Sequence, residues 1–175
     1  MNKNNTIYLI DTSAILSGRP LIFNKQKCVT SPQISNELSP GGRDYFNFQM
    51  LLEKGLLIMQ PSKQSLDTIR KIIKEYGEIQ RLSNADQELL ALAYEIQEGG
   101  KEIPIIITDD YSIQNIANEL HIKIQSLNQQ EITKRFKWGR RCRGCGKNIL
   151  DDVDVCPICG SSIKTIIIKK KSLKK

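Results

Sequence analysis

The run IPIIIT at residues 103–108 is apolar and β-branched almost throughout, and Asp109 and Asp110 follow it directly. An apolar run without polar alternation is typical of a strand that is buried on both faces of a parallel sheet. Further runs of this kind, such as TIYLI at residues 6–10, alternate with stretches whose apolar spacing is helical. The chain therefore predicts an α/β fold with a mostly parallel sheet that helices cover on both faces.

Charge is distributed unevenly along the chain. Residues 1–133 carry 13 Lys and Arg against 16 Asp and Glu, whereas residues 134–175 carry 13 against 3, a net charge of +10. Such a cationic region favours contact with a polyanion, most often nucleic acid, through phosphate contacts and counterion release. A solvated lysine tail that aids solubility is the alternative for the final KKKSLKK. No apolar run could span a bilayer and no secretion signal is recognisable, so we expect a cytoplasmic protein.

Residues 129–139 (QQEITKRFKWG) lose the strand and helix patterns, and we interpret them as a basic linker. Basic residues interleaved with aromatic ones can stack bases and hold phosphates. Equally, Trp138 can pack the linker onto the main domain, and both interpretations stay open at this point. The candidate RNA-binding residues in and beyond this segment are Arg135, Lys137, Trp138, Arg140, Arg141, Arg143, Lys147, Lys169, Lys170 and Lys171.

Acidic side chains follow the predicted strands and begin the predicted helices. These residues are Asp11, Glu37, Asp86, Asp109 and Asp110. Ligands of an open α/β sheet bind outside the carboxyl ends of its strands, so we expect the acids to converge there. Converging carboxylates repel one another unless a hard cation lies among them, and oxygen-only ligand sets suit Mg²⁺ and Mn²⁺. The pattern predicts a divalent-metal site.

Helix capping is the alternative for each single acid, because Asp at a helix N-terminus accepts hydrogen bonds from free amides. Other chemistries find little support in the sequence. It contains no G-x-x-x-x-G-K-[ST] loop, Ser13 stands where an aspartyl-phosphate phosphatase would have its second Asp, and His121 is its single histidine. Metal-assisted hydrolysis is the chemistry that remains.

Two C-x-x-C pairs, Cys142 with Cys145 and Cys156 with Cys159, are separated by ten residues, and a Gly follows each pair. Four thiolates at this spacing can enclose one tetrahedral Zn²⁺, which would stabilise a segment too short to have a core of its own. Disulfides are the alternative, which a cytoplasmic setting disfavours. The remaining Cys28 lies in an apolar run and is expected to be a small core residue.

Four motifs together resemble those of the PIN-domain nucleases over residues 6–127. They are D-T-S at 11–13, Glu37 on a short helix, S-N-A-D at 83–86 and T-D-D-Y-S-I-Q-N-I-A at 108–117. The resemblance implies a three-layer α/β/α sandwich that cuts single-stranded RNA with one or two Mg²⁺ or Mn²⁺ ions. It implies an acidic cluster of Asp11, Glu37, Asp86 and Asp109, with Ser13 and Asp110 in support. Of these, Asp11, Asp86 and Asp109 are the expected metal ligands.

A PIN domain followed by a Trp-bearing basic linker and a four-cysteine zinc ribbon resembles the archaeal Nin-one-binding (Nob) endonucleases. That resemblance implies an endoribonuclease that leaves a 3′-hydroxyl and a 5′-phosphate. Its substrate would be the 3′ end of precursor 16S ribosomal RNA within the pre-ribosomal small subunit, with ribosome-assembly proteins as further partners. The implied organisation is a PIN domain (1–128), a linker (129–139), a zinc ribbon (140–168) and a basic tail (169–175).

Two other functions remain compatible with the same residues. One is a toxin-like or messenger-decay PIN ribonuclease, which the ribbon disfavours. The other is a non-catalytic assembly factor that holds ribosomal RNA through the ribbon and tail, which the full acidic set disfavours.

Overall fold

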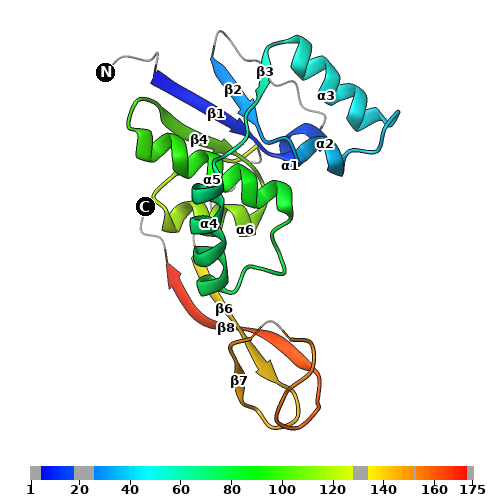
Figure 1. Cartoon of the computed structure of the whole chain (residues 1–175), viewed down its shortest axis with the longest axis vertical. Helices are drawn as coiled ribbons and strands as arrows, with labels where there is room; N and C mark the ends of the chain where they lie inside the picture. The colour runs from blue at the N-terminus through cyan, green and yellow to red at the C-terminus, as the bar shows by residue number, and fades with distance from the viewer. Residues whose placement is uncertain (1–4, 18–25, 128–133, 152, 173–175) are drawn as a thin grey trace.

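A computed structural model describes residues 5–17, 26–127, 134–151 and 153–172. For residues 134–136 and 170–172, which lie in strands, it describes the backbone but not the side chains. Figure 1 shows a larger α/β domain, residues 5–127, with a smaller antiparallel sheet beyond the end of one helix. We call this smaller part, residues 134–172, the C-terminal module. None of the helices in the described ranges is long and apolar enough to cross a membrane.

Five parallel strands form the central sheet in the order β3-β2-β1-β4-β5. They are β1 (Thr6–Ile10), β2 (Lys27–Thr30), β3 (Leu56–Ile58), β4 (Ile103–Ile107) and β5 (Lys123–Gln125). The first three strands extend the sheet in one direction, and β4 then pairs on the other side of β1. The neighbouring ends of β1 and β4 therefore flank the topological switch point, where open α/β sheets bind ligands.

Helices cover both faces of this sheet, as the apolar runs predict. Ile7 and Leu9 of β1 pack with the helices of one face, whereas Ile10 packs with those of the other, because successive side chains of a strand point to opposite faces. The first face carries α4 (Lys63–Tyr76), α5 (Asn84–Gly99) and α6 (Tyr111–Glu119). The second carries α1 (Thr12–Leu16), α2 (Ile34–Glu37) and α3 (Arg43–Glu53). The predicted three-layer α/β/α sandwich is confirmed.

The C-terminal module is a three-stranded antiparallel sheet in the order β7-β6-β8. Its strands are β6 (Lys134–Cys142), β7 (Asn148–Ile149) and β8 (Ile163–Ser172). Residues 134–139 of the predicted linker belong to β6, and residues 169–172 of the predicted tail belong to β8. Pairing between these two distant segments supplies backbone hydrogen bonds that no local pattern reveals. The other linker residues, 129–133, lie outside the described residues.

Candidate active site and metal centre

Asp11 lies at the carboxyl end of β1, where it is the N-cap of α1 and only 2% exposed. The Ser13 hydroxyl donates a 2.5 Å hydrogen bond to its Oδ2, and Thr108 Oγ1 donates to the same oxygen at 2.7 Å. Burial raises the pKa of Asp11, and the hydrogen bonds from Ser13 and Thr108 act in the opposite direction. These contacts hold the carboxylate in one orientation at the switch point.

Thr108 joins the ends of β1 and β4. Its hydroxyl donates to Asp11 and accepts a 2.9 Å hydrogen bond from the Asp110 amide, while its carbonyl accepts from Gln114 Nε2 at 2.9 Å. The side chain has no exposed surface. Thr108 is absent from the site residues predicted from the sequence. The available signal was a hydroxyl side chain at the end of a buried apolar strand, directly before two acids.

Asp86 lies in the first turn of α5, where its Oδ2 accepts a 2.8 Å hydrogen bond from the Ser83 amide in a capping box. Burial raises the pKa of Asp86 to about 6, and the negative charges of Asp11 and Asp110 contribute to the rise. Mutual repulsion of this kind requires the three carboxylates to lie near one another. The structure thus brings Asp11, Asp86 and Asp110 to one edge of the sheet.

The two adjacent acids after β4 have different partners. Asp110 is the N-cap of α6, and its Oδ1 accepts from the amides of Ser112 at 2.6 Å and Ile113 at 3.2 Å. Asp109 Oδ1 instead accepts from the Ser126 hydroxyl and from the Leu127 amide, just beyond β5. Asp109 therefore ties β4 to the chain after β5, whereas Asp110 lies near Asp86.

Two glutamates lie beside the same edge. Glu37 is exposed at the end of α2, and Thr12, the residue after Asp11, donates a 2.7 Å hydrogen bond to its Oε2. Glu88, which the predicted acidic set lacked, is buried on α5 and accepts a 3.4 Å hydrogen bond from the Gln33 amide. Glu37 thus reaches the start of α1, while Glu88 connects α5 to the start of α2.

Helix capping and charge repulsion coexist at this edge, since Asp11, Asp86 and Asp110 each accept hydrogen bonds from a helix start. Within the described ranges, the cysteines alone place three or more ligand atoms within 4.8 Å of one another. The carboxylates are therefore spaced too widely for three of them to bind one ion directly. Mg²⁺ usually keeps several waters and binds through one or two carboxylates, so the donor set fits a hydrated ion of this class.

The cysteine cluster has the dimensions of a four-thiolate metal site. Cys142 Sγ lies 3.4 Å from Cys159 Sγ, and Cys145 Sγ lies 3.8 Å from Cys156 Sγ. Four sulfurs at tetrahedral corners, each about 2.3 Å from Zn²⁺, would be about 3.8 Å apart. All four cysteines are free thiols, so the disulfide alternative finds no support in the structure. The cluster can hold a metal ion such as zinc.

Hydrogen-bond donors of the surrounding chain point at the sulfurs of Cys142 and Cys159. The amides of Gly144 and Cys145 point at Cys142 Sγ from 3.3 and 3.4 Å. Hydrogen bonds from the Ser161 side chain and amide lower the pKa of Cys159 to about 6. Gly146 and Gly160, which follow the two pairs, have φ of +72° and +70°, in the left-handed region that favours glycine.

The predicted RNA-binding cations differ in their surroundings. Arg140 and Arg141 hold the module together, because Arg140 donates to the carbonyls of Asp151 and Val153, and Arg141 Nε donates to the Gly146 carbonyl at 2.7 Å. The side chains of Arg143, Lys147 and Lys169 are exposed. Arg135, Lys170 and Lys171 lie in strands β6 and β8, and their side chains lie outside the described residues.

Trp138 packs the C-terminal module onto the α/β domain. The Arg81 guanidinium lies over its indole ring, 3.8 Å from the centroid. The neighbouring Lys137 Nζ lies 3.5 Å from Glu75 Oε1, near the end of α4. The packing role considered for Trp138 is therefore observed.

A family model described as the PIN domain of ribonuclease matches residues 8–96, which include Asp11, Glu37 and Asp86. The chain belongs to the PIN-domain ribonucleases. Endoribonuclease Nob1 of Archaeoglobus fulgidus is 33% identical to this PIN-domain chain over 156 residues, which cover 89% of the chain and 87% of the relative. Endoribonuclease Nob1 of Methanocaldococcus jannaschii is 31% identical over 171 residues, covering 97% and 82%.

Ribonuclease VapC1 of Thermoplasma acidophilum is 34% identical over 167 residues, which cover 95% of the chain and 81% of that relative. A match of this length includes the C-terminal module as well as the PIN domain. The resemblance to the PIN-domain and Nob endonucleases is confirmed, and relatives with two different names match the chain over most of its length.

Proposed function

We propose that this chain is an endoribonuclease that cuts single-stranded RNA with the help of Mg²⁺ or Mn²⁺. The observation that carries the proposal is the approach of Asp11, Asp86 and Asp110 at the switch point, where the charges of the other two contribute to the raised pKa of Asp86. Carboxylates that repel one another are stabilised by a cation among them. Relatives named Endoribonuclease Nob1 and Ribonuclease VapC1 support RNA as the substrate.

Each acid has a distinct proposed role. A divalent ion, when bound, would supply positive charge that stabilises the phosphate oxygens and makes a water more acidic. Asp11, fixed by Ser13 and Thr108, and Asp110, fixed at the start of α6, would hold this ion. Asp110 takes the place expected for Asp109, because Asp109 bonds to the chain beyond β5.

Asp86 is suited to accept a proton, because burial and the nearby charges of Asp11 and Asp110 raise the pKa of its carboxyl group and so favour its protonated form. In the proposed reaction a water oxygen bonds to phosphorus, and Asp86 receives the water proton. The bond from phosphorus to the 3′ oxygen breaks, and the departing 3′ oxygen takes up a proton from solvent water. The products are a 3′-hydroxyl and a 5′-phosphate. Glu37 lies at the exposed side of the edge and would position the water.

We infer that the target is the 3′ end of precursor 16S ribosomal RNA, as part of the pre-ribosomal small subunit. The support is the name Endoribonuclease Nob1 of relatives that match the chain over most of its length. The C-terminal module would bind one structural Zn²⁺ through its four cysteines. Its exposed Arg143, Lys147 and Lys169 would contact RNA phosphates.

A second candidate is an RNA target other than ribosomal RNA. The similarity to Ribonuclease VapC1 supports it, because that relative has a different name and its match also covers 95% of the chain. The presence of the C-terminal module therefore does not distinguish between the two targets.

One cleavage experiment tests both the activity and the target. The purified chain is incubated with Mn²⁺ and a short RNA that spans the mature 3′ end, beside a scrambled RNA of equal length. We expect a single cut in the first RNA, loss of cleavage in Asp11→Asn, and slow cutting of the scrambled RNA. Equal rates for both RNAs would favour the second target, and equal cleavage by wild type and Asp11→Asn would contradict the catalytic assignment.

A further inference from the structure

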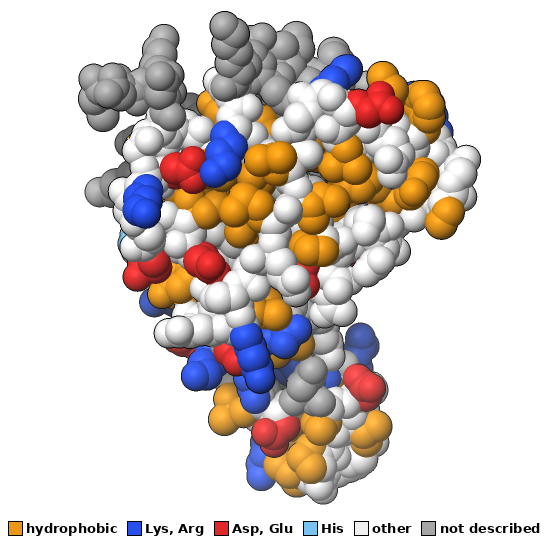
Figure 2. All heavy atoms as spheres, turned by 45° about the horizontal axis from the view of Figure 1, so that its top comes forward, with side chains coloured by type: hydrophobic (Ala, Val, Ile, Leu, Met, Phe, Trp, Pro, Cys, Tyr) orange, Lys and Arg blue, Asp and Glu red, His pale blue; other side chains and the backbone are white. Residues whose placement is uncertain are grey.

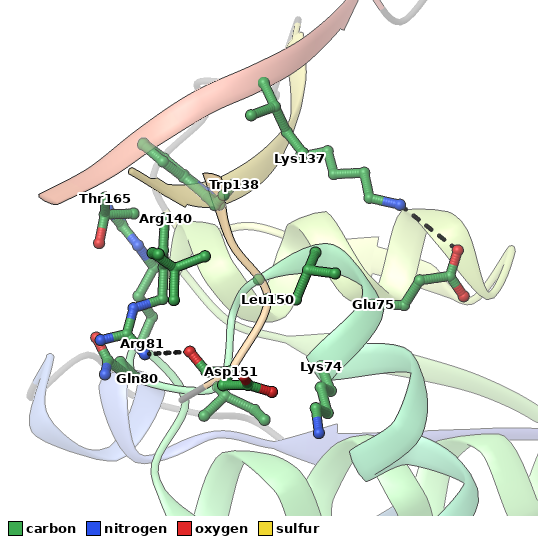
Figure 3. A pocket seen from close by; sticks show the side chains of 15 residues that line it. Lys74, Glu75, Gln80, Arg81, Lys137, Trp138, Arg140, Leu150, Asp151 and Thr165 are labelled. Carbon is green, nitrogen blue, oxygen red and sulfur yellow. Dashed lines mark hydrogen bonds and ion pairs between the residues drawn. The ribbon is translucent and has the colours of Figure 1, made fainter. Parts of the chain in front are cut away.

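A pocket with a volume of about 500 Å³ lies between the α/β domain and the C-terminal module (Figure 3). One wall is the end of α4 with the loop that leads to α5, including Lys74 and Arg81. The opposite wall comes from β6, the chain after β7, and β8, including Trp138 and Leu150. Its volume is in the range of about 300–1,000 Å³ that is usual for pockets that bind small ligands or parts of larger ones.

The pocket combines an apolar interior with cations. Trp138 and the isoleucines 79, 149 and 168 line it, together with four cations and two acids. One acid, Glu75, is already paired with Lys137 at 3.5 Å. Figure 2 shows Lys and Arg side chains gathered where the two parts of the molecule meet. Arg81 Nε lies 3.9 Å from Glu78 Oε2, and Arg140 Nη2 lies 3.9 Å from Asp154 Oδ1. In the described part of the chain, Lys74 is the lining cation without such an acidic partner, so an anionic group of a ligand would meet Lys74.

Leu150 is the most exposed large hydrophobic residue in the described part of the chain, at 92%. Leu150 itself lines the apolar pocket, so the two form one continuous apolar surface, and surfaces of this kind mark interaction sites. A ligand with a flat apolar group would cover Leu150 and the pocket interior, and its negative group would meet Lys74. Nucleotides in a single strand have this combination, because each base has an apolar face and each linkage carries one negative charge.

We propose that this pocket holds a base of the single-stranded RNA substrate, with Lys74 contacting a neighbouring phosphate. The inference rests on the proposed ribonuclease function and adds a position for the RNA beside the acidic edge. The C-terminal module would then contribute directly to substrate binding through the pocket wall that contains Leu150.

The pocket and the acids are close along the chain. Arg81 and Asp86 are five residues apart, so their Cα atoms lie within about 18 Å even if the chain between them is fully extended. A stacked strand advances about 3.4 Å per nucleotide, so about five nucleotides would cover that distance. One RNA segment can therefore reach from the pocket to the carboxylates.

Contacts inside the protein connect the same two places. Glu78, in the loop that walls the pocket, is fully buried and accepts a 2.8 Å hydrogen bond from Asn115 of α6. Asp110 directly precedes α6 and is the N-cap of that helix. The pocket wall is thus fixed to the helix that presents one of the acids.

Tryptophan fluorescence tests this proposal directly, because Trp138 is the single tryptophan of the chain and lines the pocket. Single-stranded RNA is titrated into full-length Asp11→Asn protein with zinc bound, so that binding is measured without cleavage. We expect saturable quenching of Trp138 emission. Removal of one base at successive positions of the RNA should abolish the quenching at one register only.

Two pairs of variants separate the pocket from the general charge of the protein. Lys74→Glu and Leu150→Asp alter the pocket, whereas Lys71→Glu on the same helix and Ile158→Asp in the C-terminal module change exposed residues that do not line it. We expect the pocket variants to weaken RNA binding about tenfold or more, as loss of a stacked base or of its phosphate contact would. The two control variants should bind within about twofold of the parent.

The outcomes distinguish this inference from the function on which it rests. RNA that binds by fluorescence anisotropy without quenching Trp138, or that binds Leu150→Asp as well as Ile158→Asp, would overturn the pocket assignment. Cleavage that still requires Asp11 in that case would leave the proposed function intact. Loss of cleavage specifically in the pocket variants, at sub-saturating RNA, would support the inference.

Discussion

The backbone carbonyl oxygen of Trp138 occupies the space that a Cβ atom on Gly77 would need. Gly77 is also the C-cap of α4, with φ of +72°. The missing side chain therefore serves two purposes, because it ends the helix in the left-handed conformation and lets β6 approach the helix end. Close packing at this point, rather than a linker without structure, holds the C-terminal module beside the α/β domain.

Replacement of Gly77 by Ala should therefore separate the two parts of the molecule. Gly100→Ala is the matched control, because Gly100 is the left-handed C-cap of α5 at φ +65° with no atom within 4 Å of its Cβ position. Each variant should lose about 1 kcal/mol of stability from backbone strain. Gly77→Ala alone should also shift Trp138 emission to the red. Identical emission and melting in both variants would contradict the contact.

The two acids after β4 should differ in their effect on catalysis. Asp110→Asn keeps a capping side chain but removes a charge beside Asp86, so we expect kcat to fall at least about a hundredfold. Asp109→Asn removes a charge that bonds to Ser126 and Leu127, and we expect kcat to stay within about tenfold of wild type with a lower melting temperature. Single-turnover cleavage and thermal melts measure both. The reverse order of effects would restore Asp109 as the metal ligand.

Thr108 should act as a positioning residue for Asp11. Thr108→Val keeps the shape but leaves Asp11 and the Asp110 amide without the shared hydroxyl, whereas Thr108→Ser retains it. We expect Thr108→Val to lose about 1–3 kcal/mol of stability and to bind Mn²⁺ more weakly, and Thr108→Ser to recover both. Mn²⁺ titration and urea denaturation are the measurements. Equal Mn²⁺ affinity in the Val and Ser variants would show that Thr108 does not orient the site.

Much of this structure could be predicted from the sequence, because strands such as IPIIIT are buried on both faces and carry no polar alternation. Asp11 and Asp86 could be located because strand ends and capping motifs have local signatures. The different hydrogen-bond partners of Asp109 and Asp110 could not be predicted, because they depend on where β5 ends beside β4. For the same reason β6 was missed, because its partner β8 lies more than twenty residues further along the chain.

The burial of residues at the junction of the two domains could not be predicted from the sequence either. Glu78 stands in a polar loop, Y-G-E-I-Q-R, that reads as solvent-exposed, yet Asn115 and the β6 side of the molecule enclose it. Its burial follows from tertiary packing alone. Thr108 is an intermediate case. Its position at the end of a buried strand could be predicted, but the two hydrogen bonds of its hydroxyl group could not.

The raised pKa of Asp86 predicts a stability that depends on both pH and metal. Its folded-state pKa of about 6 lies above the ordinary 3.8, so the folded protein binds this proton more tightly than the unfolded chain does. Without added Mg²⁺ or Mn²⁺, this group therefore lowers stability as the pH rises from about 4 through about 6. A bound cation favours the ionised form, so Mn²⁺ should raise the Tm more at about pH 7.5 than at about pH 5. Melts of Asp86→Asn are the control, and an equal rise at both pH values in wild type would refute the coupling.

Removal of zinc should unfold the C-terminal module and leave the α/β domain folded, because each face of the central sheet has its own core. A chelator should then expose four thiols to a thiol reagent at once. The fifth, Cys28, is 3% exposed in β2, and burial raises its pKa to about 11, so it should react only after denaturant is added. Thiol titration measures the exposure of the cysteines, metal analysis measures the loss of zinc, and far-UV circular dichroism measures unfolding. Immediate reaction of five thiols would mean that the α/β domain depends on the module, and reaction of four thiols before chelation would mean that the cysteines hold no metal.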